Sequence, residues 1–170
     1  EKTINNLKSE RIDGNPSQVE ENWSPIIKIP TNARIPETYI KEPALRLSFY
    51  RKLSSFKNSF QLEALLAELI DRFGKLPKDI VNLVNILKIR EKCKSLEIDS
   101  FEVGGKGLTI RFREGKLENI SGLLAFIESD KENIVPSNEK IFVKTKNRVD
   151  LISSYNLLKN IEKHLQKKAP

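Results

Sequence analysis

Two residue types that carry much of enzyme chemistry, cysteine and histidine, are scarce in this chain of 170 residues. It contains one cysteine, Cys93, one histidine, His164, and no methionine, even at position 1. A single cysteine cannot form an internal disulfide, and one cysteine and one distant histidine do not make a zinc site. His164 lies near the end of the chain, so histidine-based nucleophilic catalysis has no convincing site either. We therefore predict a non-catalytic piece of a longer protein, with no metal and no cofactor.

Long apolar runs are also missing. No stretch approaches the roughly 20 apolar residues that a membrane span requires, and the N-terminus has no secretory leader. The composition, 38% hydrophobic and 31% charged, is typical of one soluble globular domain. Together with the unpaired Cys93, it predicts a cytoplasmic setting. The Gly-Gly-Lys sequence that begins at Gly104 lacks the order of a phosphate-binding loop, so we interpret it as a hairpin turn.

The hydrophobic spacing predicts an α+β fold, with a helical N-terminal half followed by a ββαβα half that has a small antiparallel sheet. Prolines on both sides of residues 26–29 predict an edge strand or a surface strap there. We expect residues 1–24 to be the tail of an upstream helix plus a flexible linker, and residues 25–170 to be the domain. The predicted helices are residues 43–55, 62–73, 77–96, 117–127 and 147–167, and the later strands are a hairpin at 101–112 and residues 141–143.

The helix that begins near Leu62 has two distinct sides. One side is predicted to face the core, because its apolar residues recur every three or four positions, namely Leu62, Leu65, Leu66, Leu69, Ile70 and Phe73. Gly74 and Pro77 follow, as expected at the end of one helix and the start of the next. The other side has Ala64, Ala67, Glu68, Asp71 and Arg72 at the same spacing. Such a face could be a docking surface, or a solvated face with a local Glu68–Arg72 ion pair.

The positive charge is concentrated at the C-terminal end. After position 139 there are eight Lys or Arg and two Asp or Glu, so these 31 residues carry +6 of the net charge of +7. This segment could contact nucleic acid phosphates, and the candidate residues are Lys144, Lys146, Arg148, Lys159 and Lys163. Alternatively, the lysines complement the dipole of the last helix and keep it soluble.

Three stretches in fixed order carry a resemblance to a known family. They are Ile-Pro-Glu-Thr-Tyr-Ile at 35–40, Leu-Arg-Leu-Ser-Phe-Tyr-Arg-Lys-Leu at 45–53, and Glu-Leu-Ile-Asp-Arg-Phe-Gly-Lys-Leu-Pro at 68–77. In sequence and spacing, this set resembles the C-terminal domain of bacterial transcription-repair coupling factors, the Mfd family. The resemblance covers about residues 26–98 well and the remainder in outline.

The resemblance implies a regulatory domain of an ATP-dependent DNA translocase that removes stalled RNA polymerase and recruits the UvrA component of excision repair. It implies that the motor lies elsewhere in the parent protein. It also implies that this domain docks on the N-terminal UvrB-like module of the same protein and hides the surface that UvrA needs. The positions that match the family's interdomain contact are Glu68, Asp71 and Arg72, on the second side of the helix described above.

Overall fold

The structure, a computed structural model, describes residues 22–167. The expected upstream helix tail and most of the expected linker lie outside these residues. The chain order is β1 (Ile26–Lys28), α1 (Pro43–Ser54), α2 (Ser59–Phe73), α3 (Lys78–Ser95), β2 (Ile98–Gly104), β3 (Gly107–Phe112), α4 (Ile120–Ser129), β4 (Ile134–Ser137), β5 (Lys140–Lys144) and α5 (Leu151–Gln166). This arrangement confirms the α+β class.

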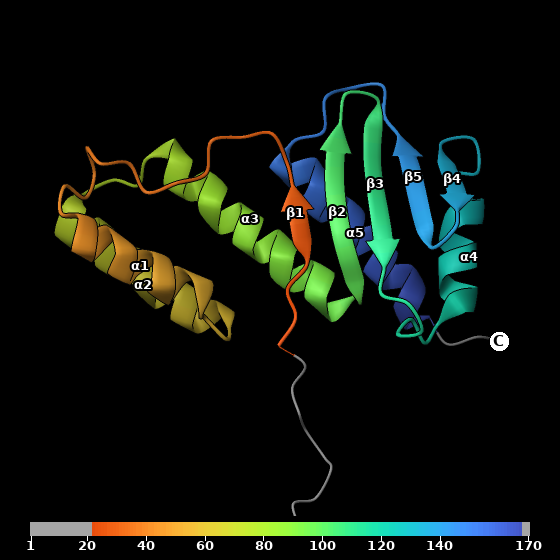
Figure 1. Cartoon of the computed structure of the whole chain (residues 1–170), viewed down its shortest axis with the longest axis horizontal. Helices are drawn as coiled ribbons and strands as arrows, with labels where there is room; N and C mark the ends of the chain where they lie inside the picture. The colour runs from red at the N-terminus through yellow and green to blue at the C-terminus, as the bar shows by residue number, and fades with distance from the viewer. Residues whose placement is uncertain (1–21, 168–170) are drawn as a thin grey trace, which may run out of the picture.

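The sheet has five strands in the order β1-β2-β3-β5-β4 and is larger than predicted. β1 runs parallel to β2, with Ile27 opposite Phe101, and the other neighbouring strands are antiparallel. A parallel pair needs a long connection, and α1, α2 and α3 supply it. The predicted edge strand is therefore confirmed. The helical half is the connection between β1 and β2 of one mixed sheet (Figure 1).

The helices gather in two places (Figure 1). α3, α4 and α5 lie on one face of the sheet, while α1 and α2 lie to one side. Two hydrophobic cores correspond to these places, one built on the sheet and one among α1, α2 and the start of α3. α3 belongs to both, because Ile80, Val84 and Leu87 enter the helical core and Ile89 and Cys93 enter the sheet core. α3 is thus apolar on two sides and connects the helical core to the sheet core.

Two details of the sheet and helices differ from the sequence prediction. β4 was not predicted, because Pro136 interrupts its short apolar run. Proline is tolerated there because β4 is an edge strand. Ile70 was placed on the core side of α2, but it is 49% exposed. The reason is geometric: Ile70 follows the buried Leu69 by one residue and therefore points about 100° away from it.

Candidate interdomain docking surface

α2 is held firmly at both ends. At its start, the Asn58 side chain accepts a hydrogen bond from the Gln61 backbone N–H (2.9 Å), and Gln61 Oε1 accepts one from the Lys57 N–H (2.8 Å). At its end, Gly74 has a φ of 89°, and its N–H donates to the Ile70 carbonyl (2.9 Å). A positive φ is costly for residues other than glycine, so the helix ends where the sequence predicts.

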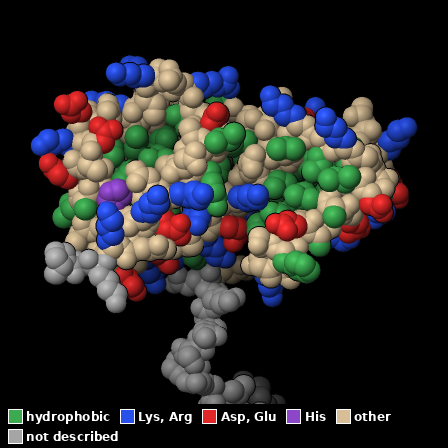
Figure 2. All heavy atoms as spheres, turned by 180° about the vertical axis from the view of Figure 1, so that it is seen from behind, with side chains coloured by type: hydrophobic (Ala, Val, Ile, Leu, Met, Phe, Trp, Pro, Cys, Tyr) green, Lys and Arg blue, Asp and Glu red, His purple; other side chains and the backbone are tan. Residues whose placement is uncertain are grey.

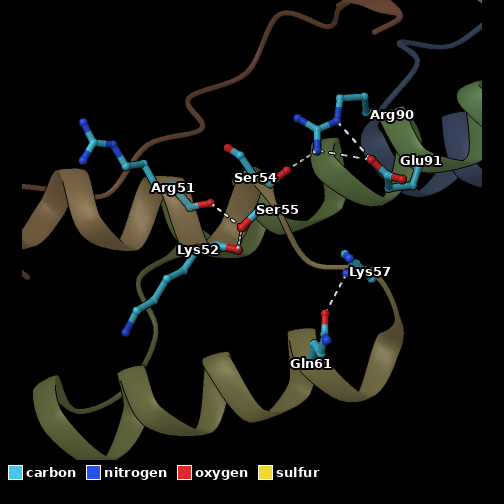
Figure 3. Close-up of polar contacts among 8 residues, drawn as sticks. All are labelled: Arg51, Lys52, Ser54, Ser55, Lys57, Gln61, Arg90 and Glu91. Atoms are coloured by element: carbon cyan, nitrogen blue, oxygen red, sulfur yellow. Dashed lines mark hydrogen bonds and ion pairs between the residues drawn. The ribbon is translucent and has the colours of Figure 1, made fainter. Parts of the chain in front are cut away.

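The loop before α2 is attached to α3 by an arginine (Figure 3). Arg90 Nη2 donates to the Ser54 carbonyl at the end of α1 (3.0 Å) and also pairs with Glu91 (3.2 Å). On the same loop, Ser55 Oγ donates to the Arg51 carbonyl (2.8 Å) and closes the last turn of α1. These contacts fix the end of α1, and with it the start of the loop that leads to α2, relative to the helix that links the two cores.

That outer face is open to solvent. Ala64, Ala67, Asp71 and Arg72 are exposed, and Glu68 is half-buried. Three leucines of α2, Leu62, Leu65 and Leu69, are buried on the opposite side. The two-sided character predicted for this helix is therefore present.

The charged residues of this face differ in how they are engaged. Glu68 accepts from Arg72 (3.0 Å) and also pairs with Lys52 of α1 (3.5 Å). The Arg72 guanidinium lies over two aromatic rings, 5.4 Å from the centre of Phe49 and 5.1 Å from that of Phe73. Within residues 22–167, by contrast, the Asp71 carboxylate makes no hydrogen bond or ion pair. Asp71 is thus the charge on this face that is available for an external partner.

One residue of the same face escaped the sequence analysis. Phe60 is 77% exposed, and it precedes Ala64, Ala67 and Asp71 at intervals of four, three and four residues. This spacing places all four on one side of the helix. Extending the alanine stripe by one turn toward the N-terminus would have found Phe60. It adds an apolar anchor to a face that otherwise consists of small and charged side chains.

The five predicted nucleic-acid contacts form two separate groups. Lys144, Lys146 and Arg148 lie at the end of β5 and in the loop after it. The Thr145 N–H donates to the Lys106 carbonyl (3.2 Å), which brings the β2–β3 turn beside this group. Lys159 and Lys163 are exposed on α5, one of the helices that cover one face of the sheet. Seen from behind, the molecule has Lys and Arg side chains spread over its surface (Figure 2). The structure therefore does not unite the five residues in one patch.

The three sequence stretches that carry the family resemblance contact one another. The Tyr50 hydroxyl accepts from the Ile35 N–H (2.7 Å), and Arg46 Nη1 donates to the Ile40 carbonyl (2.8 Å). The ring of Phe73 packs edge-on against that of Phe49, with their centres 5.8 Å apart. Much of the shared pattern thus builds the helical core that holds α2, and Arg46 has a structural role in it.

Few groups in the described residues have a shifted pKa. Burial raises the pKa of the Cys93 thiol to about 12 and raises that of Tyr39. The pKa of Asp150, which caps α5, is lowered because its carboxylate accepts hydrogen bonds from Ser153. Residues 22–167 contain no group of three His, Cys, Asp or Glu side chains that could hold a metal ion. In the same residues, we find no helix of the length and apolarity that crossing a membrane requires.

Comparison with known proteins identifies the family. A family model described as "TRCF domain" matches residues 29–123, which is more than half of the chain. The transcription-repair-coupling factor of Rickettsia prowazekii (strain Madrid E) is 31% identical over 149 residues, which are 86% of this chain and 13% of that protein. The Escherichia coli (strain K12) protein of the same name is 33% identical over 99 residues, 58% of this chain and 9% of that protein.

The chain thus spans about an eighth or less of the length of these relatives. A crystal structure of the C-terminal domain of transcription-repair coupling factor has the same fold. It superimposes with a TM-score of 0.68 and 21% identity, covering 84% of this chain and 92% of that one. The matched stretches, the fold and the relatives agree: the chain belongs to the TRCF domain family.

Proposed function

We propose that this domain is the non-catalytic regulatory domain of a transcription-repair coupling factor, and that it docks on the N-terminal UvrB-like module of the same protein. While docked, it covers the surface that UvrA binds. In this proposal the parent protein is an ATP-dependent DNA translocase that acts on stalled RNA polymerase. The observation that carries the proposal is the outer face of α2. There, the unengaged Asp71 lies beside two exposed alanines and the exposed Phe60.

The chemistry of this face fits an interdomain contact. Small residues at positions 64 and 67 let a partner approach the backbone of α2 closely, and Phe60 supplies an apolar anchor. Asp71 provides a charge whose pairing fixes the register of the partner. Such a contact need not be strong, because a tethered domain meets its partner at a high effective concentration. A difference of about 2 kcal/mol keeps the contact mostly closed, and engagement of DNA or polymerase elsewhere can open it.

Isothermal titration calorimetry of the domain against the separate UvrB-like module tests the proposal. We expect measurable binding at micromolar concentrations, and its loss in Asp71→Arg, which places a positive charge where a negative one is needed. The control is Asp130→Arg, an exposed substitution of the same charge at the end of α4. If the native domain does not bind at high micromolar concentration, or if both variants bind like the native domain, the docking proposal is wrong.

A second candidate function is contact with nucleic acid phosphates at the end of the sheet. The observation that favours it is the backbone hydrogen bond from the Thr145 N–H to the Lys106 carbonyl, which brings the β2–β3 turn beside Lys144, Lys146 and Arg148. Binding of duplex DNA should then weaken steeply with added salt, because each phosphate contact releases counterions. Replacing Lys144 and Lys146 by alanine should reduce the salt dependence, whereas replacing Lys159 and Lys163 should not.

A further inference from the structure

An apolar groove lies at the end of the molecule opposite α1 and α2, between α4 and the β4–β5 hairpin (Figure 1). Its volume is about 630 Å³. This falls within the range typical of sites that hold a ligand or an inserted side chain. The apolar part of its lining includes Phe112, Leu117, Ile120, Leu124, Ile127 and Ile141.

α4 is fixed from one side and open on the other. Its inner side packs against α5, where the rings of Phe126 and His164 lie 5.5 Å apart. The approach of α5 at Gly122 is so close that a Cβ atom there would lie 2.5 Å from the His164 carbonyl oxygen. On the side toward the groove, Ile120 is 61% exposed and Leu124 is 60% exposed. Apolar side chains this exposed and this close together are unusual on a surface that contacts only water.

These side chains follow the spacing of a helix-packing surface. Ile120, Leu123, Leu124 and Ile127 occupy positions i, i+3, i+4 and i+7, and all four line the groove. Helices that pack on another helix or on a groove use the same spacing. The partner that fits this apolar surface is therefore a second amphipathic helix, which would lie between α4 and the β4–β5 hairpin.

The charge around the groove is opposite to that of the rest of the chain. Residues 112–141, the span from the first to the last residue that lines the groove, contain six Asp or Glu and four Lys or Arg, a net charge of −2, in a chain of net charge +7. Glu114 and Glu139 line the groove itself, together with Lys140 and Arg113. Arg113 is already engaged, because it pairs with Glu97 (2.8 Å) and lies over the Trp23 ring (4.1 Å). The groove is therefore apolar, and the segment that forms it has a net negative charge.

We propose that this groove binds an amphipathic α-helix whose apolar stripe packs on Ile120 and Leu124 and whose flanks carry Lys or Arg. Burial of apolar side chains provides the affinity. The net negative charge of the segment that forms the groove favours a helix with basic flanks over one with acidic flanks. The groove and the outer face of α2 lie at opposite ends of the molecule (Figure 1), so the two surfaces can be occupied at the same time. This proposal does not depend on the docking function proposed for α2.

The test uses the whole chain and two labelled helical peptides of about 16 residues, long enough to form helix on binding. Both peptides carry leucine at i, i+3, i+4 and i+7. In one the remaining positions are mostly lysine, and in the other they are mostly glutamate. Because the net charge of the protein is +7, non-specific electrostatic attraction favours the acidic peptide. We expect fluorescence anisotropy to show that the basic peptide binds at least about tenfold more tightly, a difference of ~1.4 kcal/mol.

Two matched variants locate the binding site. Leu124→Lys should weaken the basic peptide at least about tenfold, because it removes apolar contact and adds a like charge. Ile152→Lys is the control, since Ile152 is 69% exposed on α5 and the substitution changes the net charge equally. Both sites are exposed, so thermal unfolding should show that both variants fold. Equal or tighter binding of the acidic peptide, or equal weakening by the two variants, would overturn the proposal. Self-association of the chain that Leu124→Lys abolishes would also overturn it, because a second copy would then be the occupant.

Discussion

The hydroxyl of Tyr39 donates to the carbonyl group of Gly74, with an O···O distance of 2.8 Å, and lies 3.0 Å from the carbonyl of Leu69. Carbonyl groups at the end of a helix have no partner within the helix. One side chain, from the turn before α1, thus ties down the end of α2 next to the glycine that terminates it. Its ring lies 5.7 Å from that of Phe73, which fixes the same turn from the side.

We therefore expect Tyr39→Phe to lower the free energy of unfolding by about 1 kcal/mol, the usual cost of a lost hydrogen bond. The ring and its packing remain, so the effect isolates the hydroxyl. Urea unfolding followed by circular dichroism measures it. Tyr155→Phe on α5 is the control, since Tyr155 makes no hydrogen bond through its hydroxyl within residues 22–167. An equal loss in both variants would show that the Tyr39 hydroxyl contributes nothing specific.

The hairpin turn between β2 and β3 gives a second prediction. Gly107 has a φ of 151°, and a Cβ atom there would lie 2.1 Å from the Val143 carbonyl oxygen on β5. Gly107→Ala should therefore cost about 2 kcal/mol or more in the free energy of unfolding, through overpacking and backbone strain. Gly105→Ala, two residues earlier, meets nothing within 4 Å. It should change stability by less than about 0.5 kcal/mol. Thermal unfolding of the two variants provides the comparison, and similar melting temperatures would contradict it.

The same turn shows what the sequence can predict. Alternating apolar residues around Gly104 and Gly107 indicate a hairpin, and the structure pairs these two glycines across the turn. The helix that starts after Pro77 and the end of α2 at Gly74 are equally local, because each depends on spacing within a few residues. Such features are fixed by neighbours in the chain, so periodicity and turn chemistry suffice to predict them.

Features that depend on distant partners were not predictable in this way. Ile26 and Ile27 indicate a strand, but nothing near them indicates that β1 pairs in parallel with β2, some 70 residues later. The groove beside α4 likewise arises only when β4 and β5 meet that helix, and the spacing of its apolar residues predicted only the helix and strands that contain them. At the α2 face, the spacing predicted which residues point outward. It could not predict that Arg72 lies over Phe49, since α1 supplies that ring.

The outer face of α2 contains a matched pair for separating stability from docking. Arg72→Ala removes two cation–π contacts and the ion pair with Glu68, so it should lower the free energy of unfolding by about 1 kcal/mol. Asp71→Ala removes a carboxylate without such contacts and should change stability by less than about 0.5 kcal/mol. Both variants should weaken docking on the UvrB-like module in calorimetry. If Asp71→Ala leaves docking unchanged while Arg72→Ala weakens it, the effect of Arg72 is structural and Asp71 is not part of the contact.

Cys93 yields a prediction about pH, because its thiol is completely buried and its pKa is raised to about 12. In the unfolded chain a cysteine has a pKa of about 8.5. Between these two values the unfolded state has lost the thiol proton and the folded state retains it. The stability contributed by this group is therefore complete below about pH 8.5 and is lost as the pH rises toward 12.

The native protein should react slowly with a thiol reagent at about pH 8 and rapidly once unfolded. Urea unfolding at increasing alkaline pH should show a smaller loss of stability in Cys93→Ala than in the native chain, since only the native chain can release this proton on unfolding. Equal slopes for the two proteins would mean that the thiol titrates alike in both states and that its burial in the sheet core is incomplete.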